Sequence, residues 1–131
     1  IHANNYSFGQ NMLFHCFFVE VYSEKRPWGS FEKFNENEQC TVKLLYIKPG
    51  SRLSLQYHNN RKEFWKIVKG SGTVEVQNKK SSISEGDNII IPSGTKHRIQ
   101  ASSSGCIVLE ISYGNFDEND IVRIEDDYDR V

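Results

Sequence analysis

The chain has 131 residues, of which 37% are hydrophobic and 25% charged, and it carries 16 basic against 17 acidic side chains. This length fits one domain around a single core, and the near-neutral charge excludes the broad positive field that nonspecific nucleic-acid binding requires. Three cysteines at irregular spacing form neither a disulfide framework nor a CxxC motif, so we expect a reducing, cytoplasmic setting.

The first predicted element is the apolar stretch at residues 12–22. It contains His15 and Glu20 and is far shorter than the ~20 residues of a membrane-spanning helix, so we expect no membrane contact. We interpret residues 1–25 as an N-terminal extension. Within it, residues 14–22 could add a strand to the sheet of a second copy, which predicts a homodimer; the alternative is that this run folds back on its own domain.

The remainder, residues 26–131, shows short runs rich in Val, Ile, Leu, Phe and Tyr without sustained helical periodicity. Turn signals separate the runs: PG at 49–50, GSG at 70–72, NKK at 78–80, EGDN at 85–88 and PSG at 92–94, while SSS at 102–104 indicates a loop. The pattern predicts an all-β sandwich or closed barrel. The expected strands cover residues 17–22 in the extension and, in the remainder, residues 30–34, 41–48, 52–58, 64–69, 73–77, 88–91, 97–101, 107–112 and 121–124.

Four potential metal ligands lie on this predicted framework. Alternation along residues 52–58 puts Gln56 and His58 on one face, together with Arg52 and Ser54, and leaves Leu53, Leu55 and Tyr57 facing outward. Glu63 opens the next strand, and His97 follows the tight turn at 92–96. Two imidazoles, one carboxylate and one amide oxygen suit Zn²⁺, Mn²⁺, Fe²⁺ or Co²⁺.

The spacing of these residues carries a family resemblance. Gly50-(5)-Gln56-x-His58-(4)-Glu63-(6)-Gly70 resembles the first cupin motif, and Gly86-(5)-Pro92-x-Gly94-(2)-His97 resembles the second. Among cupins, the chain is similar to the phosphomannose isomerase domain of type II mannose-6-phosphate isomerases in RPWGSFEKF (26–34), KPGSRLSLQYH (48–58), the pair Glu63 and Trp65, IPSGTKHR (91–98) and DIVRIEDDY (120–128).

The resemblance implies a cupin double-stranded β-helix, a jelly-roll barrel, over residues 26–131. It also implies one divalent metal ion, for which we expect Zn, with Co, Mn or Fe as alternatives. The implied ligands are Gln56, His58, Glu63 and His97. The implied reaction is the aldose–ketose interconversion of mannose 6-phosphate and fructose 6-phosphate.

This reaction needs a base that moves a proton between C1 and C2. We expect Glu110 to be the base, because it stands among apolar neighbours and burial raises the pKa of a carboxyl group. The 6-phosphate needs cations, and Arg61, Lys96 and Arg98 flank the ligand residues. Arg52 is about 20 Å from His58 along an ideal strand, so we expect it to be structural or to contact a larger ligand.

Alternatives remain open at this level. The family usually has histidines where this chain has Asn59, Asn60 and Phe64. Asn59 and Asn60 favour a metal-binding cupin without isomerase activity that acts as a sugar-binding or regulatory module, and an Fe²⁺-dependent dioxygenase uses a similar ligand set. Family members commonly carry a fused mannose-1-phosphate guanylyltransferase, but these 131 residues contain no Gly-rich nucleotide-binding loop. We therefore expect no guanylyltransferase activity.

Overall fold

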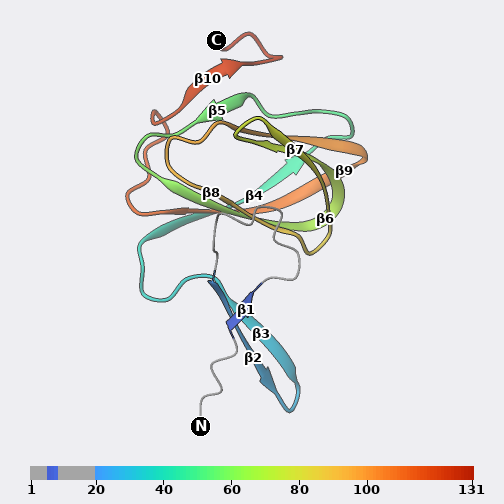
Figure 1. Ribbon diagram of the computed structural model, residues 1–131, viewed down its shortest axis with the longest axis vertical. Coiled ribbons are helices and arrows are strands. Elements are labelled where there is room, and N and C mark those ends of the chain that lie inside the picture. Colours follow the sequence, from blue (N-terminus) through green and yellow to red (C-terminus); the bar gives the residue numbers. More distant parts are fainter. Residues whose placement is uncertain (1–5, 9–19) are drawn as a thin grey trace.

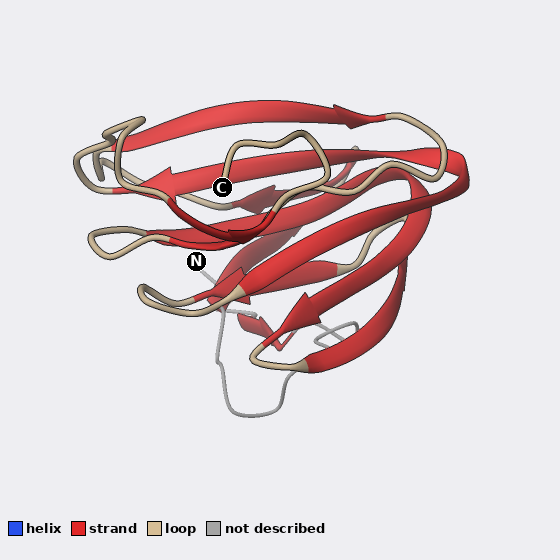
Figure 2. Ribbon diagram, turned by 90° about the horizontal axis from the view of Figure 1, so that it is seen from above, coloured by secondary structure: helices blue, strands red, loops and turns tan. Residues whose placement is uncertain are grey.

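The computed structural model describes residues 6–8 and 20–131, and the regular structure in this part of the chain consists of strands alone (Figure 2). The all-β prediction is confirmed. The described strands are β1 (Tyr6–Phe8), β2 (Glu20–Arg26), β3 (Gly29–Lys33), β4 (Cys40–Ile47), β5 (Leu55–Tyr57), β6 (Lys62–Val76), β7 (Lys79–Ser84), β8 (Asn88–Ile91), β9 (His97–Tyr113) and β10 (Val122–Glu125).

The two longest strands, β6 and β9, pair antiparallel along most of their length and build the barrel. The first half of β6 also pairs with β8, and its second half pairs with β7. In the same way, the first half of β9 pairs with β5 and its second half with β4. Each long strand therefore has one partner along its first half and another along its second half, within a single seven-stranded sheet that closes into a jelly-roll barrel.

Glycines allow the bend in both long strands. The register between β6 and β9 shifts around Ile67–Gly72. A Cβ atom on Gly70 would lie 2.2 Å from the backbone oxygen of Gly105, so the two strands approach too closely there for any side chain. The sequence-based prediction of a turn at 70–72 and a loop at 102–104 is wrong, because both segments lie inside continuous strands. Glycine at positive φ serves a bulge as readily as a turn.

Two further strand predictions need correction. β7 was missed because Lys79–Ser84 is almost entirely polar, and its first lysines were interpreted as part of a turn. The predicted strand at 52–58 is shorter, since only Leu55–Tyr57 is a strand and Arg52 forms an isolated bridge with Gln100. Leu53 packs against the interior core, so it does not face outward as the alternation predicted.

The barrel interior is filled by one apolar cluster. Its buried members are Ile47, Trp65, Ile67, Val74, Val76, Ile83, Ile89, Ile91, Ile99, Ala101, Cys106 and Val108. A second cluster joins the outer face of the barrel to the small sheet β1–β2–β3, which projects from the lower side of the barrel in Figure 1. Here Val21 packs with Phe64 and Ile111.

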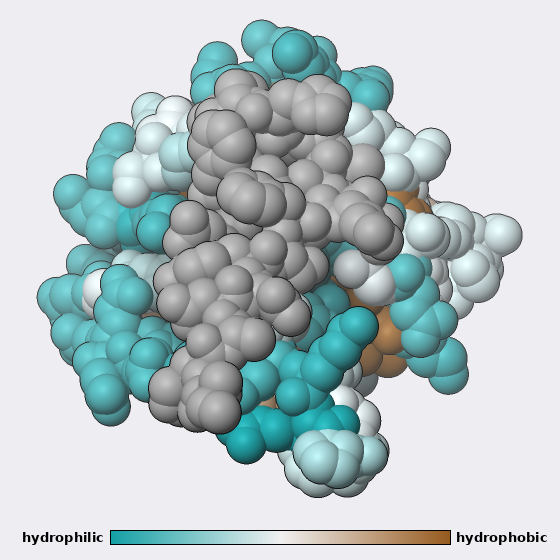
Figure 3. Space-filling model, turned by 60° about the horizontal axis from the view of Figure 1, so that its bottom comes forward, coloured by the Kyte–Doolittle hydropathy of each residue, from teal (hydrophilic) through white to brown (hydrophobic). Residues whose placement is uncertain are grey.

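The segment predicted to form a dimer, residues 14–22, lies mostly outside the described residues. Its last part, Glu20–Tyr22, begins β2 and pairs with β1 and β3 of the same chain. Hydrophilic side chains cover most of the described surface in the view of Figure 3, with a small hydrophobic area among them. Among the described residues there is no helix with the length and apolar composition needed to cross a bilayer.

Candidate metal centre

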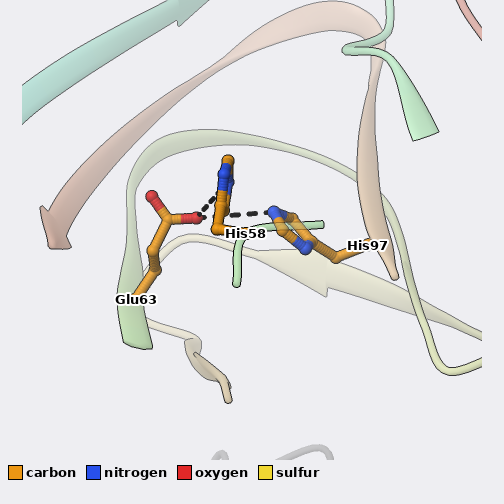
Figure 4. Close-up of side chains that lie close together, drawn as sticks. All are labelled: His58, Glu63 and His97. Carbon is orange, nitrogen blue, oxygen red and sulfur yellow. Dashed lines mark ion pairs between the residues drawn. The ribbon is translucent and has the colours of Figure 1, made fainter. Parts of the chain in front are cut away.

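Three of the four predicted ligands meet inside the barrel. His58 follows β5, Glu63 belongs to β6 and His97 opens β9, and their potential ligand atoms lie within 4.8 Å of one another. Oε1 of Glu63 is 3.0 Å from Nε2 of His58 and 3.4 Å from Nε2 of His97. Figure 4 shows this single oxygen directed at both imidazoles. The three side chains are 3%, 1% and 0% exposed, so bulk water does not solvate them.

Gln56, the fourth predicted ligand, lies beside the cluster. It is the cross-strand partner of His97 between β5 and β9, and partners in such a pair project from the same face. Its Oε1 accepts a hydrogen bond from Ser54 Oγ at 3.1 Å. An amide oxygen is therefore available next to His97, although Gln56 is not itself part of the three-residue cluster.

The outer nitrogen of each imidazole is bound to a backbone carbonyl. Nδ1 of His58 donates to the oxygen of Asp120 at 2.6 Å, and Nδ1 of His97 donates to the oxygen of Thr95 at 2.8 Å. A carbonyl only accepts, so Nδ1 must carry the hydrogen, and in a neutral imidazole Nε2 is then a bare lone pair. Both Nε2 atoms thus face the cluster as acceptors, which is the arrangement of metal-bound histidines.

This arrangement needs positive charge at its centre. With both imidazoles neutral, Glu63 Oε1 and His97 Nε2 are buried and have no hydrogen-bond partner. Burial alone would raise the pKa of Glu63, but hydrogen bonds and charge from His58 and His97 in their protonated forms outweigh burial and hold that pKa below its usual range. Either protons on the imidazoles or a divalent cation can supply the charge. The donor set of two nitrogens and a carboxylate oxygen fits such a cation.

The second oxygen of Glu63 is also held. Ser112 Oγ donates to Oε2 at 3.1 Å, and Arg61 Nε lies 3.5 Å from the same atom. Ser112 is the cross-strand neighbour of Glu63 in β9, so the pairing of the two long strands places its hydroxyl there. Each of the three clustered residues therefore has an outer partner that fixes its orientation.

Glu110, the predicted base, lies in the same interior. It stands opposite Trp65 of β6 and opposite Lys43 of β4, and Trp65 Nε1 donates to its Oε2 at 3.0 Å. Burial, together with the negative charge of Glu63, raises the pKa of Glu110 to about 7. The sequence-based expectation of a buried carboxyl group with a raised pKa agrees with this environment. Its catalytic role stays a prediction.

The three predicted phosphate contacts have different environments. Arg61 is buried against the cluster, with its guanidinium 4.6 Å over the ring of Phe116 and Nη1 donating to Asp117 O. Lys96 is exposed at the turn before β9. Arg98 does not reach the cluster, because it follows His97 in the strand and projects from the opposite face, where Nη1 binds Glu125 at 3.0 Å.

Arg52 binds the C-terminal segment: its Nε and Nη2 donate to the two oxygens of Asp127 at 2.7 and 2.8 Å. The three departures from the family pattern lie around the cluster rather than in it. Asn59 and Asn60 are exposed, while Phe64 faces away from Glu63 and packs 5.4 Å from the ring of Phe34. The Phe64 departure is therefore accounted for by the second apolar cluster.

Sequence reasoning missed two cations that project from the same faces as Gln56 and Glu110. Arg123 of β10 is the cross-strand partner of Gln56, so it projects from the ligand face, and its Nε is buried without a hydrogen-bond partner. Lys43 projects from the same face as Glu110, and its Nζ lies 4.4 Å over Phe116. Both positions depend on pairing between strands far apart in the sequence. The only sequence signal was that Arg123 stands within the DIVRIEDDY segment.

Comparison with known proteins identifies the family. The family model described as mannose-6-phosphate isomerase C-terminal matches residues 14–126. A mannose-1-phosphate guanylyltransferase of Escherichia coli is 38% identical over 115 residues, and the alginate biosynthesis protein AlgA of Pseudomonas aeruginosa is 38% identical over 121 residues. These alignments cover 85% and 89% of this chain but 23% and 24% of those proteins, so the chain spans about a quarter of their length.

Solved structures agree on the fold. Oxalate decarboxylase from Bacillus subtilis aligns with a TM-score of 0.60 and 28% identity, over 66% of this chain and 24% of that one. A cupin protein from Bacteroides fragilis aligns with a TM-score of 0.53 and 21% identity, over 60% of this chain and 70% of that one. The second identity is low enough to support the fold alone. The chain therefore belongs to the mannose-6-phosphate isomerase C-terminal family and has the cupin fold.

Proposed function

We propose that this chain binds one divalent metal ion through His58, Glu63, His97 and Gln56 and interconverts mannose 6-phosphate and fructose 6-phosphate. The observation that carries the proposal is the pair of buried, unpartnered acceptor atoms on Glu63 and His97, with a second buried carboxyl group, Glu110, beside them. We propose Zn as the metal; the Mn(II) centres of the similar Bacillus subtilis oxalate decarboxylase favour testing Mn as well.

A divalent cation bound here would act as a Lewis acid on the substrate oxygens and lower the cost of the enediolate. The chain's own contribution is the proton transfer between C1 and C2. Glu110 is suited to it because a carboxyl group with a pKa of about 7 both accepts and returns a proton near neutral pH. The Nε1–H of Trp65 holds one oxygen of Glu110, which leaves the other oxygen to exchange the proton.

The phosphate would be held by cations at the mouth of the barrel. Arg61 and Lys96 are the proposed contacts from the sequence, and the orientation of Arg123 adds a third. The buried Nε of Arg61 makes no hydrogen bond, although it lies 3.5 Å from Glu63 Oε2, so among the proposed phosphate contacts Arg61 is one that lies directly beside the metal ligands. Removing it should raise KM more than it lowers kcat, since a phosphate contact is made in both the ground state and the transition state.

The test is an assay for fructose 6-phosphate formed from mannose 6-phosphate, using protein loaded separately with Zn²⁺, Co²⁺ or Mn²⁺. Glu110→Gln should retain the metal and lose turnover by about 100-fold or more, because the amide keeps the shape of the side chain but cannot accept the proton. Glu75→Gln, which changes a carboxylate near Lys80 on the outer face, is the matched control and should keep full activity.

Two outcomes would count against the proposal. Wild-type protein that binds metal but forms no fructose 6-phosphate with any of the three metals would remove the isomerase assignment. Full activity in Glu110→Gln would leave the isomerase in place and show that another group moves the proton.

A second candidate function is a metal-binding cupin that binds a sugar phosphate without turnover. It is favoured by Asn59 and Asn60, which stand where similar isomerases have histidines. It is also favoured by relatives, such as those of Escherichia coli and Salmonella typhimurium, that are named for guanylyltransferase activity rather than for isomerase activity. Calorimetry separates the two functions. Saturable binding of mannose 6-phosphate by metal-loaded protein, without any product, would support the second.

A further inference from the structure

The loop between β9 and β10, residues 114–121, lies against the loop that follows β5. Three hydrogen bonds from one residue join them. The backbone oxygen of Asp120 accepts from His58 Nδ1 at 2.6 Å. Its two carboxylate oxygens accept the backbone N–H groups of Asn59 at 2.8 Å and Asn60 at 2.9 Å. Asp120 thus binds three consecutive residues, one of which is a proposed metal ligand.

The position of the Asp120 backbone carbonyl depends on the contacts of the Asp120 carboxylate. Its carboxylate is anchored to the residues directly after His58, so it fixes the distance between the two loops. This anchoring holds the Asp120 carbonyl within hydrogen-bond distance of His58 Nδ1. The loop is stiffened from within by further backbone bonds, from Asp120 N to Asp117 O at 3.0 Å and from Ile121 N to Asn119 O at 2.9 Å. His97 needs no such device, because Thr95, the acceptor for its Nδ1, is only two residues away.

We propose that Asp120 is the positioning residue of His58: its carboxylate holds the β9–β10 loop so that its own carbonyl keeps the hydrogen on Nδ1 and directs Nε2 at Glu63. The inference rests on the metal site of the proposed function but not on isomerase activity. It also explains how exposed Asn59 and Asn60 contribute to the site, since they act through their backbone N–H groups rather than their side chains. A fork of two acceptor oxygens matches two adjacent N–H groups, and an amide would offer only one.

The first measurement is metal affinity, by titration with Co²⁺ and Zn²⁺. Asp120→Ala should weaken binding by about 10- to 100-fold, the usual effect of losing an outer partner of a metal-bound histidine. Asp120→Asn keeps one acceptor oxygen and should fall between wild type and Asp120→Ala. Glu118→Gln removes the same charge from the same loop, where exposed Glu118 pairs with partly exposed Lys43, and should remain within about twofold of wild type.

The second measurement separates positioning from general damage. The Nδ1–H protons of His58 and His97 should both be visible by NMR in wild-type protein, metal-free and zinc-loaded, because each is bound to a carbonyl. Asp120→Ala should speed exchange of the His58 proton and leave that of His97 unchanged, so His97 is an internal control. The more conservative Asp120→Asn variant gives the same comparison if Asp120→Ala does not fold.

The proposal is overturned if metal affinity and the His58 Nδ1–H proton are unchanged in both variants. It is also overturned if the His97 proton is lost together with that of His58, because the effect would then be a general loosening of the barrel. A wild-type protein that binds metal but has no isomerase activity would refute the proposed reaction and leave these two readouts intact.

Discussion

At the scale of single residues, the environment of a histidine determines which of its nitrogens is free to bind. In this chain a backbone carbonyl binds Nδ1 of both His58 and His97 and leaves Nε2 for the cluster. His97 is in addition fixed by packing, since its ring lies 5.5 Å from that of Trp65 in an edge-on contact. The cluster is thus preorganised by groups that never touch its centre.

His97→Ala should reduce metal affinity by more than the ~10- to 100-fold expected for loss of an outer partner, because it removes a proposed ligand directly. The barrel should stay folded by circular dichroism, since the apolar interior cluster is intact. Metal content measured by elemental analysis after dialysis is the readout. A variant with unchanged metal content would show that the ligand assignment is wrong.

The sequence was most informative about these residues and least about their neighbours. Strand alternation, a turn signal and the resemblance to two cupin motifs grouped Gln56 with His58, Glu63 and His97. The structure brings the ligand atoms of the last three within 4.8 Å of one another. The positions of Arg123 and Arg98 could not be read in this way. Each depends on which strand lies alongside and on which face the residue projects, and this information comes from pairing across long stretches of sequence.

At the scale of the strand, the bends in β6 and β9 depend on glycine for two reasons that can be tested separately. Gly70 has a φ of +83°, and an added Cβ would meet the backbone oxygen of Gly105 at 2.2 Å. Gly50 has a similar φ of +74°, but nothing lies within 4 Å of its added Cβ. The two positions therefore share the backbone strain and differ in the steric clash.

Gly50→Ala should lower the free energy of unfolding by about 1–2 kcal/mol, the cost of a left-handed alanine. Gly70→Ala should cost about 1–3 kcal/mol more, because a backbone atom cannot move aside as a flexible side chain can. Urea denaturation of both variants measures the difference. Equal losses at the two positions would mean that β6 and β9 separate at the bend at little cost.

The junction between the barrel and its small sheet predicts a pH dependence. Tyr113, the last residue of β9, donates its hydroxyl to the backbone oxygen of Phe34 at 3.0 Å. Burial, with a smaller effect of nearby Glu38 and Cys40, raises the pKa of Tyr113 from 10.0 to about 12. Because the pKa of Tyr113 is higher in the folded state, folding favours the protonated phenol. The stability that the protonated Tyr113 contributes is complete below pH 10 and is lost as the pH rises towards 12.

Denaturation of wild type and Tyr113→Phe at pH 9 and pH 11.5 tests this expectation. Tyr113→Phe should be less stable at pH 9 by about 0.5–1.5 kcal/mol, since it loses one hydrogen bond. Between pH 9 and pH 11.5, the free energy of unfolding of the variant should fall by less than that of wild type, because phenylalanine does not ionise. Identical losses in the two proteins would rule out Tyr113 as the source.

At the scale of the whole molecule, the expected homodimer stays a prediction. The barrel and its small sheet account for Glu20–Tyr22 within one chain, so an exchange of strands would have to involve the part of residues 14–22 that precedes them. Light scattering at micromolar concentration should give the mass of two chains. A variant without residues 1–19, which also lacks the three-residue strand β1, should then be monomeric and keep the β-rich circular dichroism of the barrel. A monomeric 131-residue chain would contradict the prediction.

The pairing of distant strands also sets the order in which the protein can fold. Strand β4 at Cys40–Ile47 pairs with residues 106–113, and β5 pairs with β10 at Val122–Glu125. During synthesis both strands leave the ribosome long before their partners. Until the partners emerge, the edges of these strands are unpaired, and unpaired strand edges are prone to aggregate. Such nonlocal topologies refold in milliseconds to seconds rather than microseconds. The carbonyl that orients His58 belongs to Asp120, 62 positions later, so a nascent chain gains its complete metal centre only after residue 120 has left the ribosome.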